Sequence, residues 1–390
     1  MLNKDSIIGV IGSGAMGSGI AQVAATAGHR VHLFDSNSGA LTLAEKGLKT
    51  SLAKLVEKQK LSSAEADGIQ SRIHFEPDMS CFRHCALVIE AIIENLDVKK
   101  KLFMQLEGIV HADAILASNT SSLSIASIGA ACRDARRVIG IHFFNPATLM
   151  PLVEIIPAIT SSAAIALESK SLIDTWGKVT VMVKDTPGFI VNRVARSFYG
   201  ESIRIYEEGI ASKATIDWAL KTYGGFRMGP FELMDFIGND INYKVTESVW
   251  EQFFYEPRFK PSLTQKRLFE AGLYGRKTGR GYYDYAEGVV QPQPEKDESK
   301  GAMIFNRVIA MLINEAADAL YLQVASREDI DLAMTKGVNY PKGLLKWADE
   351  LGTDYVLHIL EQLHQEYQEE RYRPCILLKT MGRTKRKFYE

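Results

Sequence analysis

Two polar residues in apolar segments of the chain could carry out acid–base chemistry. His142 lies in the stretch Ile-His-Phe-Phe-Asn-Pro, and Glu154 follows twelve residues later in Leu-Val-Glu-Ile-Ile. An imidazole beside a buried carboxylate can act as a general base, because the carboxylate fixes the tautomer and stabilises the imidazolium that forms. The same pair could also be an ion pair of the core without a catalytic role. The elements around the two residues have to decide between these interpretations.

A glycine-rich turn at residues 12–17, Gly-Ser-Gly-Ala-Met-Gly, is typical of a site for a dinucleotide. It follows an apolar strand predicted for 6–11 and precedes a helix of small residues predicted for 18–27. In that context the three glycines, in order, make the tight turn, let the pyrophosphate approach the backbone, and pack the helix closely on the strand. The start of the helix supplies unpaired N–H groups and the positive end of its dipole for the phosphates.

The cofactor predicted from this turn is NAD rather than NADP. A second apolar strand, predicted for 30–34, ends at Asp35, which lies 23 residues after Gly12. A carboxylate at this place hydrogen-bonds the ribose hydroxyls of NAD and repels the 2′-phosphate of NADP.

The residues after Asp35 continue the alternation of helices and strands. We expect helices over 37–60 and 96–109, and strands over 86–91, 114–118, 137–143, 152–156 and 179–183. Such alternation predicts an α/β domain whose parallel sheet carries helices on both faces. Ligands of such sheets bind at the carboxyl ends of the strands. Ser121 and His142 both lie at the end of a predicted strand, which favours a ligand-binding role over core packing.

The second half of the chain is predicted to be helical. After Gly188 we expect a long helix over 189–208, a second helix that contains 217–223, and a third that Gly229-Pro230 opens. A proline suits the first turn of a helix because its missing N–H has no partner there. The stretch 286–301 is poor in apolar residues and predicts a linker.

The helical segment recurs after this linker. Residues at a spacing of 114 match in the two segments: Asn192, Arg193 and Val194 with Asn306, Arg307 and Val308, Glu201 with Glu315, Asp217 with Asp331, Gly229 with Gly343, Asp235 with Asp349, Gly238 with Gly352, and Asp240 with Asp354. So many matches at one spacing indicate a duplication. We therefore predict an α/β Rossmann-type NAD-binding domain (1–186) followed by two repeated all-α helical domains (187–285 and a degenerate copy, 302–390), joined by the linker.

Composition and charge exclude several classes of function. The 390-residue chain has 46% hydrophobic and 24% charged residues and a formal net charge of −1, so no nucleic acid and no membrane surface is expected as a partner. It has no apolar run of about 18 residues and no apolar leader, which predicts a cytoplasmic protein. The four cysteines are too scattered for a disulfide framework. Cys81, His84 and Cys85 lack a fourth ligand at a suitable spacing, so we expect no metal.

Several motifs in order resemble those of the L-3-hydroxyacyl-CoA dehydrogenases. They run from residue 6 to about residue 285 and are the glycine-rich turn, Ser-Asn-Thr-Ser-Ser (118–122), His-Phe-Phe-Asn-Pro (142–146), Asp-Thr-Pro-Gly-Phe-Ile-Val-Asn-Arg (185–193) and Gly-Arg-Lys-Thr-Gly-Arg-Gly-Tyr-Tyr-Asp-Tyr (275–285). The resemblance implies an enzyme with an acyl-CoA substrate. Its reaction would be the reversible, NAD-dependent oxidation of an (S)-3-hydroxyacyl-CoA to the 3-ketoacyl-CoA, in fatty-acid or related acyl-CoA metabolism.

The resemblance also implies which residues form the site. The catalytic set would be Ser121, His142, Glu154 and Asn192. The residues near NAD would be Gly12, Gly14, Ala15, Met16, Gly17, Asp35, Glu94, Lys99, Ser121, Asn145 and Lys277. Those near the CoA moiety would be Ser51, Lys58 and Lys99. In this set His142 takes the hydroxyl proton and Glu154 orients it. Hydrogen bonds to the reacting oxygen or the thioester carbonyl would come from Ser121 and Asn192.

Two other functions fit parts of the sequence. A related dehydrogenase of a free hydroxy acid or sugar acid would keep the His142–Glu154 pair and the nucleotide turn, but it would not need Lys58 as a CoA contact. A non-catalytic NAD-binding protein would need none of the four catalytic residues. The presence of the whole set argues against the non-catalytic alternative.

The second helical copy is expected to carry no chemistry. Its apolar residues recur at helical spacing, at Ile309, Leu312, Ile313, Ala316 and Leu320, so one face of the copy must be covered. Single-copy members of the resembled family typically dimerise through the helical domain, and the linker here tethers the second copy to the first. We therefore predict an intramolecular pseudo-dimer of helical domains. A further homodimer through other surfaces stays open.

Overall fold

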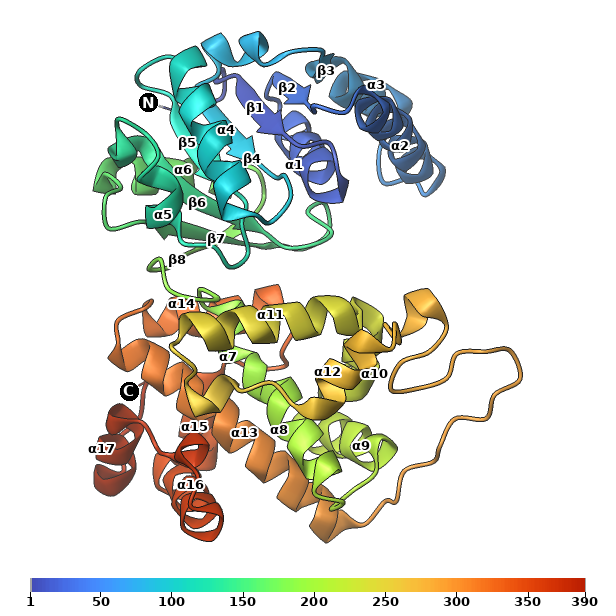
Figure 1. Cartoon of the computed structure of the whole chain (residues 1–390), viewed down its shortest axis with the longest axis vertical. Coiled ribbons are helices and arrows are strands. Elements are labelled where there is room, and N and C mark those ends of the chain that lie inside the picture. The colour runs from blue at the N-terminus through green and yellow to red at the C-terminus, as the bar shows by residue number, and fades with distance from the viewer. Residues whose placement is uncertain (1, 390) are drawn as a thin grey trace. The chain divides into compact units, whose positions relative to one another are not determined.

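In the computed structural model, which describes residues 2–389, the chain divides into two units between Thr186 and Pro187. The first unit is built around one sheet and the second is built from helices (Figure 1). The predicted fold class, an α/β domain followed by helical repeats, is confirmed. None of the helices within residues 2–389 has the length and apolar character needed to cross a membrane.

An eight-stranded sheet forms the centre of the first unit, in the order β3-β2-β1-β4-β5-β6-β7-β8. Its strands are β1 (Ile8–Ile11), β2 (Val31–Phe34), β3 (Ile73–Glu76), β4 (Leu87–Glu90), β5 (Ile115–Ser118), β6 (Val138–Phe143), β7 (Leu152–Pro157) and β8 (Val179–Met182). The pairs among β1 to β6 are all parallel, and burial on both faces explains why the inner strands β1, β4, β5 and β6 are nearly continuous apolar runs. The strand order reverses between β1 and β4, and ligands of such sheets bind at the carboxyl ends of the strands at this point.

The prediction of a fully parallel sheet is wrong at one place. β7 runs antiparallel to β6, with His142 opposite Glu154 in the register, and β8 then pairs parallel to β7. A parallel connection needs a crossover of a dozen residues or more. Residues 144–151 are too few for such a crossover, so the chain turns back instead. The prediction of strands over 137–143 and 152–156 was therefore right, but alternation with helices does not hold between them.

Six helices complete the first unit. They are α1 (Ala15–Thr26), α2 (Ser38–Glu57), α3 (Ser63–Arg72), α4 (Leu96–Ile109), α5 (Ile125–Gly129) and α6 (Ala163–Thr175). Apolar residues of α1, α2, α3 and α6 share one hydrophobic core with the sheet. The sequence did not predict α3 or the short strand β3. A capping box marks the start of α3, where the Ser62 hydroxyl accepts from the Glu65 N–H and the Glu65 carboxylate accepts from the Ser62 N–H.

The second unit contains two successive sets of helices. The first set is α7 (Val191–Val194), α8 (Arg196–Glu207), α9 (Lys213–Gly224), α10 (Pro230–Ile237), α11 (Asn239–Gln252) and α12 (Leu263–Glu270). The second set is α13 (Glu298–Tyr321), α14 (Arg327–Gly337), α15 (Leu344–Leu351), α16 (Thr353–Tyr367) and α17 (Ile376–Thr384). Proline stands at the first turn of α10, as predicted. In sequence order α13 corresponds to α7 plus α8, and α14 to α17 correspond to α9 to α12.

Many residues that recur in both sets are helix caps. The Asp217 carboxylate accepts hydrogen bonds from two backbone N–H groups at the start of α10, and the Asp331 carboxylate does the same at the start of α15. A Cβ atom on Gly229 would stand 2.3 Å from Asp217, and one on Gly343 would stand 2.3 Å from Asp331. The repeated aspartates and glycines are therefore retained to join two helices.

Two predicted boundaries in the helical part are wrong. The helix expected over 189–208 is interrupted at Ala195, and the carbonyl of Asn192 accepts a hydrogen bond from the Arg196 side chain at 2.8 Å. The apolar pattern continues across Ala195 and gives no sign of the break. The linker expected over 286–301 also ends early, because α13 already begins at Glu298. Its N-cap is Asp297, whose carboxylate accepts from the backbone N–H three residues later at 2.8 Å.

The two sets of helices are packed together in one unit. α13 packs against α8 and α9 of the first set and against α15, α16 and α17 of its own set (Figure 1). Of the five apolar residues predicted to form a covered face, Ile309, Leu312, Ile313 and Ala316 are buried and Leu320 is partly buried. The face of α13 predicted to need cover is thus enclosed.

Candidate active site and nucleotide groove

The glycine-rich turn between β1 and α1 has the geometry predicted for a dinucleotide site. Gly12 has a φ of +95°, which favours glycine, and a Cβ there would stand 2.5 Å from the Ala91 carbonyl oxygen. A Cβ on Gly17 would stand 1.7 Å from the Gly12 carbonyl oxygen, so the helix could not pack this closely with any other residue. A Cβ on Gly14 meets no atom within 4 Å. Space over Gly14 is what the approach of a pyrophosphate requires.

The first turn of α1 points its N–H groups into a groove. Gly14 is the N-cap of α1 and has no side chain to occupy those groups, and Ala15 and Met16 form the first turn. A cavity of about 470 Å³ adjoins this turn and is lined by residues 13–15, by α1, by α2 and by residues 146–148. The residues present therefore fit the pyrophosphate and ribose of a dinucleotide, which bind helix N-termini in this way.

Asp35 follows β2 and lies beside the turn. One carboxylate oxygen accepts hydrogen bonds from the backbone N–H and the hydroxyl of Ser13, at 2.7 and 2.9 Å, and the other accepts from the Asn37 N–H at 2.9 Å. Burial alone would favour the neutral acid, but these hydrogen bonds outweigh it and hold the pKa of Asp35 below its usual range. The group at the end of β2 is therefore an anion, as the prediction of NAD over NADP requires.

His142 and Glu154 meet inside the sheet. The imidazole Nδ1 lies 2.7 Å from a carboxylate oxygen of Glu154, and the two side chains are 7% and 1% exposed. They come from opposite positions of β6 and β7, so the backbone register itself holds the pair together. The Asn119 side chain accepts from the Phe143 N–H at 2.8 Å and ties β6 to the loop that follows β5. Sequence reasoning had given Asn119 no such role.

Glu94 organises the loop that carries Ser121. Its carboxylate accepts hydrogen bonds from the hydroxyl of Thr120 at 2.6 Å and from the N–H groups of Ser121 and Ser122 at 2.9 and 3.2 Å. Burial opposes its ionisation, but Lys99 and these hydrogen bonds keep the pKa of Glu94 below the usual value. Glu94, which was predicted near the cofactor, is thus a fixed anion that positions Ser121.

Lys99 lies deeper than the prediction of a ligand contact implies. Its side chain is 1% exposed, and its ammonium donates to Glu90 at 2.5 Å and lies 3.4 Å from Glu94. The second oxygen of Glu90 accepts from the Ser118 hydroxyl at 2.6 Å. An ammonium in this position supports the Ser121 loop through Glu94, and its place near a ligand stays a prediction. Glu90 was missed by sequence analysis, although a carboxylate at the end of an apolar strand was a signal for it.

The remaining predicted residues are distributed as follows. Asn145 is exposed in the loop between β6 and β7. Asn192 lies in α7 of the second unit. Lys277 also belongs to the second unit, where its ammonium pairs with the Asp240 carboxylate at 2.6 Å. The places of Asn145, Asn192 and Lys277 near a ligand stay predictions.

The two residues predicted near the CoA moiety line one cavity. Ser51 and Lys58 belong to a cavity of about 470 Å³ on the first unit, together with Lys54, Lys60 and Lys178. Ser51 also lines the groove beside the glycine-rich turn, so the two cavities adjoin each other. Lys178 donates to the carbonyls of Ala147 and Met150 at 2.5 and 2.8 Å, and burial lowers the pKa of Lys178. The other three lysines give the cavity a positive charge.

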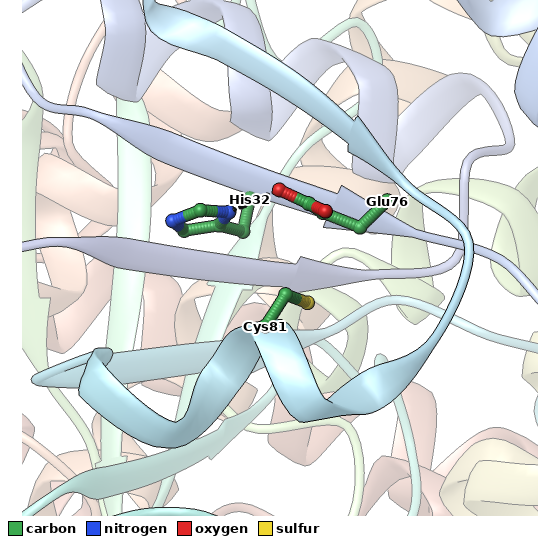
Figure 2. A group of neighbouring side chains, drawn as sticks. All are labelled: His32, Glu76 and Cys81. Carbon is green, nitrogen blue, oxygen red and sulfur yellow. Dashed lines mark hydrogen bonds and ion pairs between the residues drawn. The ribbon is translucent and has the colours of Figure 1, made fainter.

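One group of possible metal ligands lies apart from this groove. Figure 2 shows His32 and Glu76 on the neighbouring strands β2 and β3, with Cys81 on the short 3₁₀ helix Met79–His84. The His32 Nδ1 and a Glu76 oxygen are 2.5 Å apart, which is a hydrogen bond between strands. Two ligands of one zinc ion, each about 2.0–2.1 Å from the metal, would lie more than 3 Å apart. Burial also raises the pKa of the Cys81 thiol to about 12. We therefore interpret the group as a structural contact held by this hydrogen bond.

Models of known protein families match nearly the whole chain. The model described as 3-hydroxyacyl-CoA dehydrogenase, NAD binding domain, matches residues 7–186, and that of the C-terminal domain matches residues 188–285 and again 303–388. The chain belongs to the 3-hydroxyacyl-CoA dehydrogenase family. Membership confirms the predictions of an oxidoreductase with an NAD-binding domain and of NAD as its cofactor. The double match also agrees with the duplication predicted from the repeated residues.

Individual relatives extend this comparison. A 3-hydroxyadipyl-CoA dehydrogenase of Escherichia coli is 38% identical over 97% of this chain and 98% of its own length. The crystal structure of a 3-hydroxybutyryl-CoA dehydrogenase from Escherichia coli superposes with a TM-score of 0.93 and 37% identity over 98% of this chain and 99% of that one. A shorter (S)-3-hydroxybutyryl-CoA dehydrogenase from Ralstonia eutropha, 36% identical with a TM-score of 0.70, is wholly matched by 73% of this chain. Members of this family therefore exist with and without a second helical copy.

Proposed function

We propose that the protein catalyses the reversible, NAD-dependent oxidation of an (S)-3-hydroxyacyl-CoA to the 3-ketoacyl-CoA. The observation that carries this proposal is the buried His142–Glu154 pair, with Nδ1 and the carboxylate oxygen 2.7 Å apart at the carboxyl end of a strand. A pair with this geometry can take a proton from a hydroxyl group and stabilise the charge that results. The family and the names of the relatives support the same reaction.

In the proposed reaction His142 accepts the proton of the 3-hydroxyl through Nε2, while its Nδ1 stays bonded to Glu154. Glu154 holds the ring in place and offsets the positive charge of the imidazolium. Bound NAD supplies the acceptor for the hydride that leaves C3. Ser121, which Glu94 holds through the backbone, and Asn192 would each hydrogen-bond the reacting oxygen or the thioester carbonyl. In the reverse direction His142 returns the proton to the forming alcohol.

The lysines of the cavity beside α2 would bind the phosphate groups of CoA. Ser51 and Lys58 were expected there, and Lys54 and Lys60 line the same cavity. Several ammonium groups around one hollow suit a ligand with three phosphates. A dehydrogenase of a free hydroxy acid would have no use for them. This cavity therefore favours a CoA thioester over the alternative of a free hydroxy or sugar acid.

The second helical copy would serve as an internal partner for the first, forming an intramolecular pseudo-dimer. Two buried ion pairs related by the repeat support this: Arg193 with Glu315 at 2.6 Å, and Arg307 with Glu201 at 2.5 Å. Asn306, the counterpart of Asn192, donates to the Tyr355 hydroxyl at 3.0 Å, which agrees with a copy that does no chemistry. A homodimer through other surfaces remains open to measurement by light scattering.

The test is the loss of absorbance at 340 nm when the protein meets NADH and a 3-ketoacyl-CoA. We expect turnover with acetoacetyl-CoA and none with free acetoacetate, and a panel of acyl groups with and without a distal carboxylate would set the chain preference. Turnover of the free acid alone would favour the alternative dehydrogenase. No turnover of any substrate, with NADH still bound, would favour a non-catalytic NAD-binding protein.

A further inference from the structure

A buried carboxylate of the second helical copy holds the residue that follows Asn192. Arg193 lies in α7, and its Nε is 2.6 Å from a carboxylate oxygen of Glu315 in α13. Its Nη2 is 2.9 Å from Asp318, one turn further along α13. The side chains of Arg193 and Glu315 are 2% and 0% exposed. The second copy therefore forms ion pairs with α7 at the residue next to Asn192.

The repeat forms a second contact of this kind between the two copies. We call each buried arginine with the two carboxylates of the other copy that it contacts a joint. Arg307 is the counterpart of Arg193, and its Nε is 2.5 Å from Glu201, the counterpart of Glu315. The Nη1 of Arg307 is also 2.9 Å from Glu208. Both arginines are thus bound by two carboxylates of the other copy. The two joints share this buried arginine–carboxylate contact, but Glu315 also pairs with Arg258 at 3.0 Å, whereas Glu201 accepts from the Tyr372 hydroxyl at 2.6 Å.

The two joints differ in the helix that each one holds. Arg307 is part of α13, a continuous helix from Glu298 to Tyr321. Arg193 is part of α7 (Val191–Val194), which only Ala195, itself in a helical conformation, divides from α8. The helical hydrogen-bond ladder is interrupted there, because the Asn192 carbonyl accepts from the Arg196 side chain, so tertiary contacts help to fix the geometry of α7. In α7 the charged contact comes from the second copy.

The surroundings of the two arginines differ as well. The hydroxyls of Tyr367 and Tyr372 accept hydrogen bonds from Arg307 at 2.8 and 2.7 Å. Around Arg193 the rings are Phe253, 5.1 Å from the guanidinium, and Phe259, which offer no hydroxyl. A cavity of about 400 Å³ borders this joint. The position of Arg193 therefore depends on Glu315 and Asp318 more than the position of Arg307 depends on its two carboxylates.

We propose that Glu315, assisted by Asp318, is a positioning residue for Asn192, so that the second copy supports the reaction although it carries no catalytic residue. This inference rests on the proposed role of Asn192 in binding the reacting oxygen or the thioester carbonyl. Loss of the Glu315 charge leaves the buried guanidinium groups of Arg193 and Arg258 without this carboxylate, and such groups rearrange toward water. Arg193 and the short helix α7 move together, and the adjoining Asn192 loses its position.

The experiment compares Glu315→Gln with its repeat-related control Glu201→Gln in the full chain. Both variants neutralise one buried carboxylate, and because Glu315 pairs with Arg258 as well as Arg193, we expect Glu315→Gln to lower the melting temperature at least as much as Glu201→Gln. Only Glu315→Gln should lower kcat with acetoacetyl-CoA and NADH, by about tenfold, with kcat/KM lowered equally and the Kd of NADH unchanged. Equal effects of the two variants on kcat would mean that Glu315 serves stability alone, and would overturn the proposal.

A second comparison shows whether the effect passes through Asn192. In an Asn192→Ala background, Glu315→Gln should cause little further loss of kcat, because the residue that it positions is gone. If the two losses multiply, Glu315 acts elsewhere and the inference fails while the role of Asn192 stands. If Asn192→Ala alone leaves kcat unchanged, the role of Asn192 in the proposed function fails, and this inference fails with it.

A milder pair of variants covers the case in which Glu315→Gln does not fold. Asp318 and Glu208 are the partly exposed second carboxylates of the two joints, with side chains 22% and 27% exposed. We expect Asp318→Asn to lower kcat several-fold and Glu208→Gln to leave kcat within a factor of two. Equal kcat values for these two variants would overturn the proposal as well.

Discussion

His142 and Glu154 stand directly opposite each other in the antiparallel pair β6–β7, and the Nδ1 and carboxylate oxygen atoms are 2.7 Å apart. Opposite residues of an antiparallel pair are held at a fixed separation by the ladder on either side of them. The orienting carboxylate therefore does not rely on a flexible loop. The turn at residues 144–151 takes the place of a helical crossover. Because of this turn, β7 pairs antiparallel with β6 and Glu154 comes to lie opposite His142.

Replacement of His142 by Gln should remove the proposed general base and little else. A positioned acid–base group contributes a factor of about 10² to 10⁴ to turnover, so we expect kcat with acetoacetyl-CoA and NADH to fall within that range. The nucleotide turn lies elsewhere on the sheet, and the Kd of NADH measured by fluorescence should barely change. A variant with near-normal kcat would show that His142 is not the base.

Glu154→Gln keeps the shape of the side chain and removes its charge. The imidazolium that forms during oxidation then lacks its partner, and kcat should fall by up to about 10⁴, the loss seen when an orienting carboxylate is neutralised in this way. The pH–rate profile of oxidation should shift too, whereas circular dichroism and NADH binding should match the unmodified protein. An unchanged profile and kcat would assign Glu154 a structural role only.

Local patterns predicted the elements of the site better than their pairing. The glycine-rich turn, Asp35 and the apolar strands each carry their signal within a few residues of sequence. The antiparallel direction of β7 depends on how a short turn closes, and at the break in the helix the Arg196 side chain donates to the Asn192 carbonyl and to Thr246 of α11, which is distant in sequence. The burial of Lys99 could not be predicted from its place on an amphipathic helix, because its partner Glu90 lies on a strand. Contacts between residues that are distant in sequence cannot be predicted from the pattern of a single sequence.

Asp35 should give the enzyme a preference for NADH over NADPH. A lost hydrogen bond to a charged group and a contact between like charges each cost about 1.5 kcal/mol, which together correspond to roughly 100-fold in kcat/KM. Because the hydrogen bonds from Ser13 and Asn37 hold the pKa of Asp35 below its usual range, the carboxylate stays charged as pH falls. The preference should therefore persist from pH 8 down to pH 5. Comparable kcat/KM values for the two cofactors would refute this role.

Lys58→Gln should weaken the binding of the CoA moiety without slowing the reaction itself. An exposed ammonium–phosphate contact is worth up to about 1 kcal/mol, so KM for acetoacetyl-CoA should rise three- to fivefold with kcat unchanged, and added salt should reduce the difference. With acetoacetyl-pantetheine, which carries no phosphate, the variant should equal the unmodified protein. Lys49→Gln is the matched control, because Lys49 lies on the same helix but pairs with Glu45 at 2.8 Å. A similar rise of KM in both variants would argue against a phosphate site at Lys58.

Several residues recur in both sets of helices because the fold needs them. The sequence alone did not show whether these residues have a structural or a catalytic role. Asp235 accepts from the N–H groups of Tyr282 and Tyr283, and Asp349 accepts from those of Phe388 and Tyr389. These hydrogen bonds recur because in each copy the aspartate fixes the last segment of the copy to the helix that carries the aspartate. The repeat therefore marks the positions needed for folding, and the continuous helix α13 marks where the second copy departs from the first.

Truncation after Tyr285 should uncover the surface of α8 and α9 that α13 occupies. Val308, Leu312 and Ile313 of α13 are fully buried, and each such side chain is worth about 1.5–3 kcal/mol of burial. Removal of α13 also leaves Arg193 and Glu201 without the partners of their buried ion pairs. The exposed surface should then be covered by a second molecule, so light scattering should report a dimer or an aggregate, with a lower melting temperature. Asn306→Ala, which keeps the second copy whole, should leave mass, melting temperature and kcat unchanged. A truncated protein that stays monomeric and equally stable would show that the second copy does not act as the internal partner.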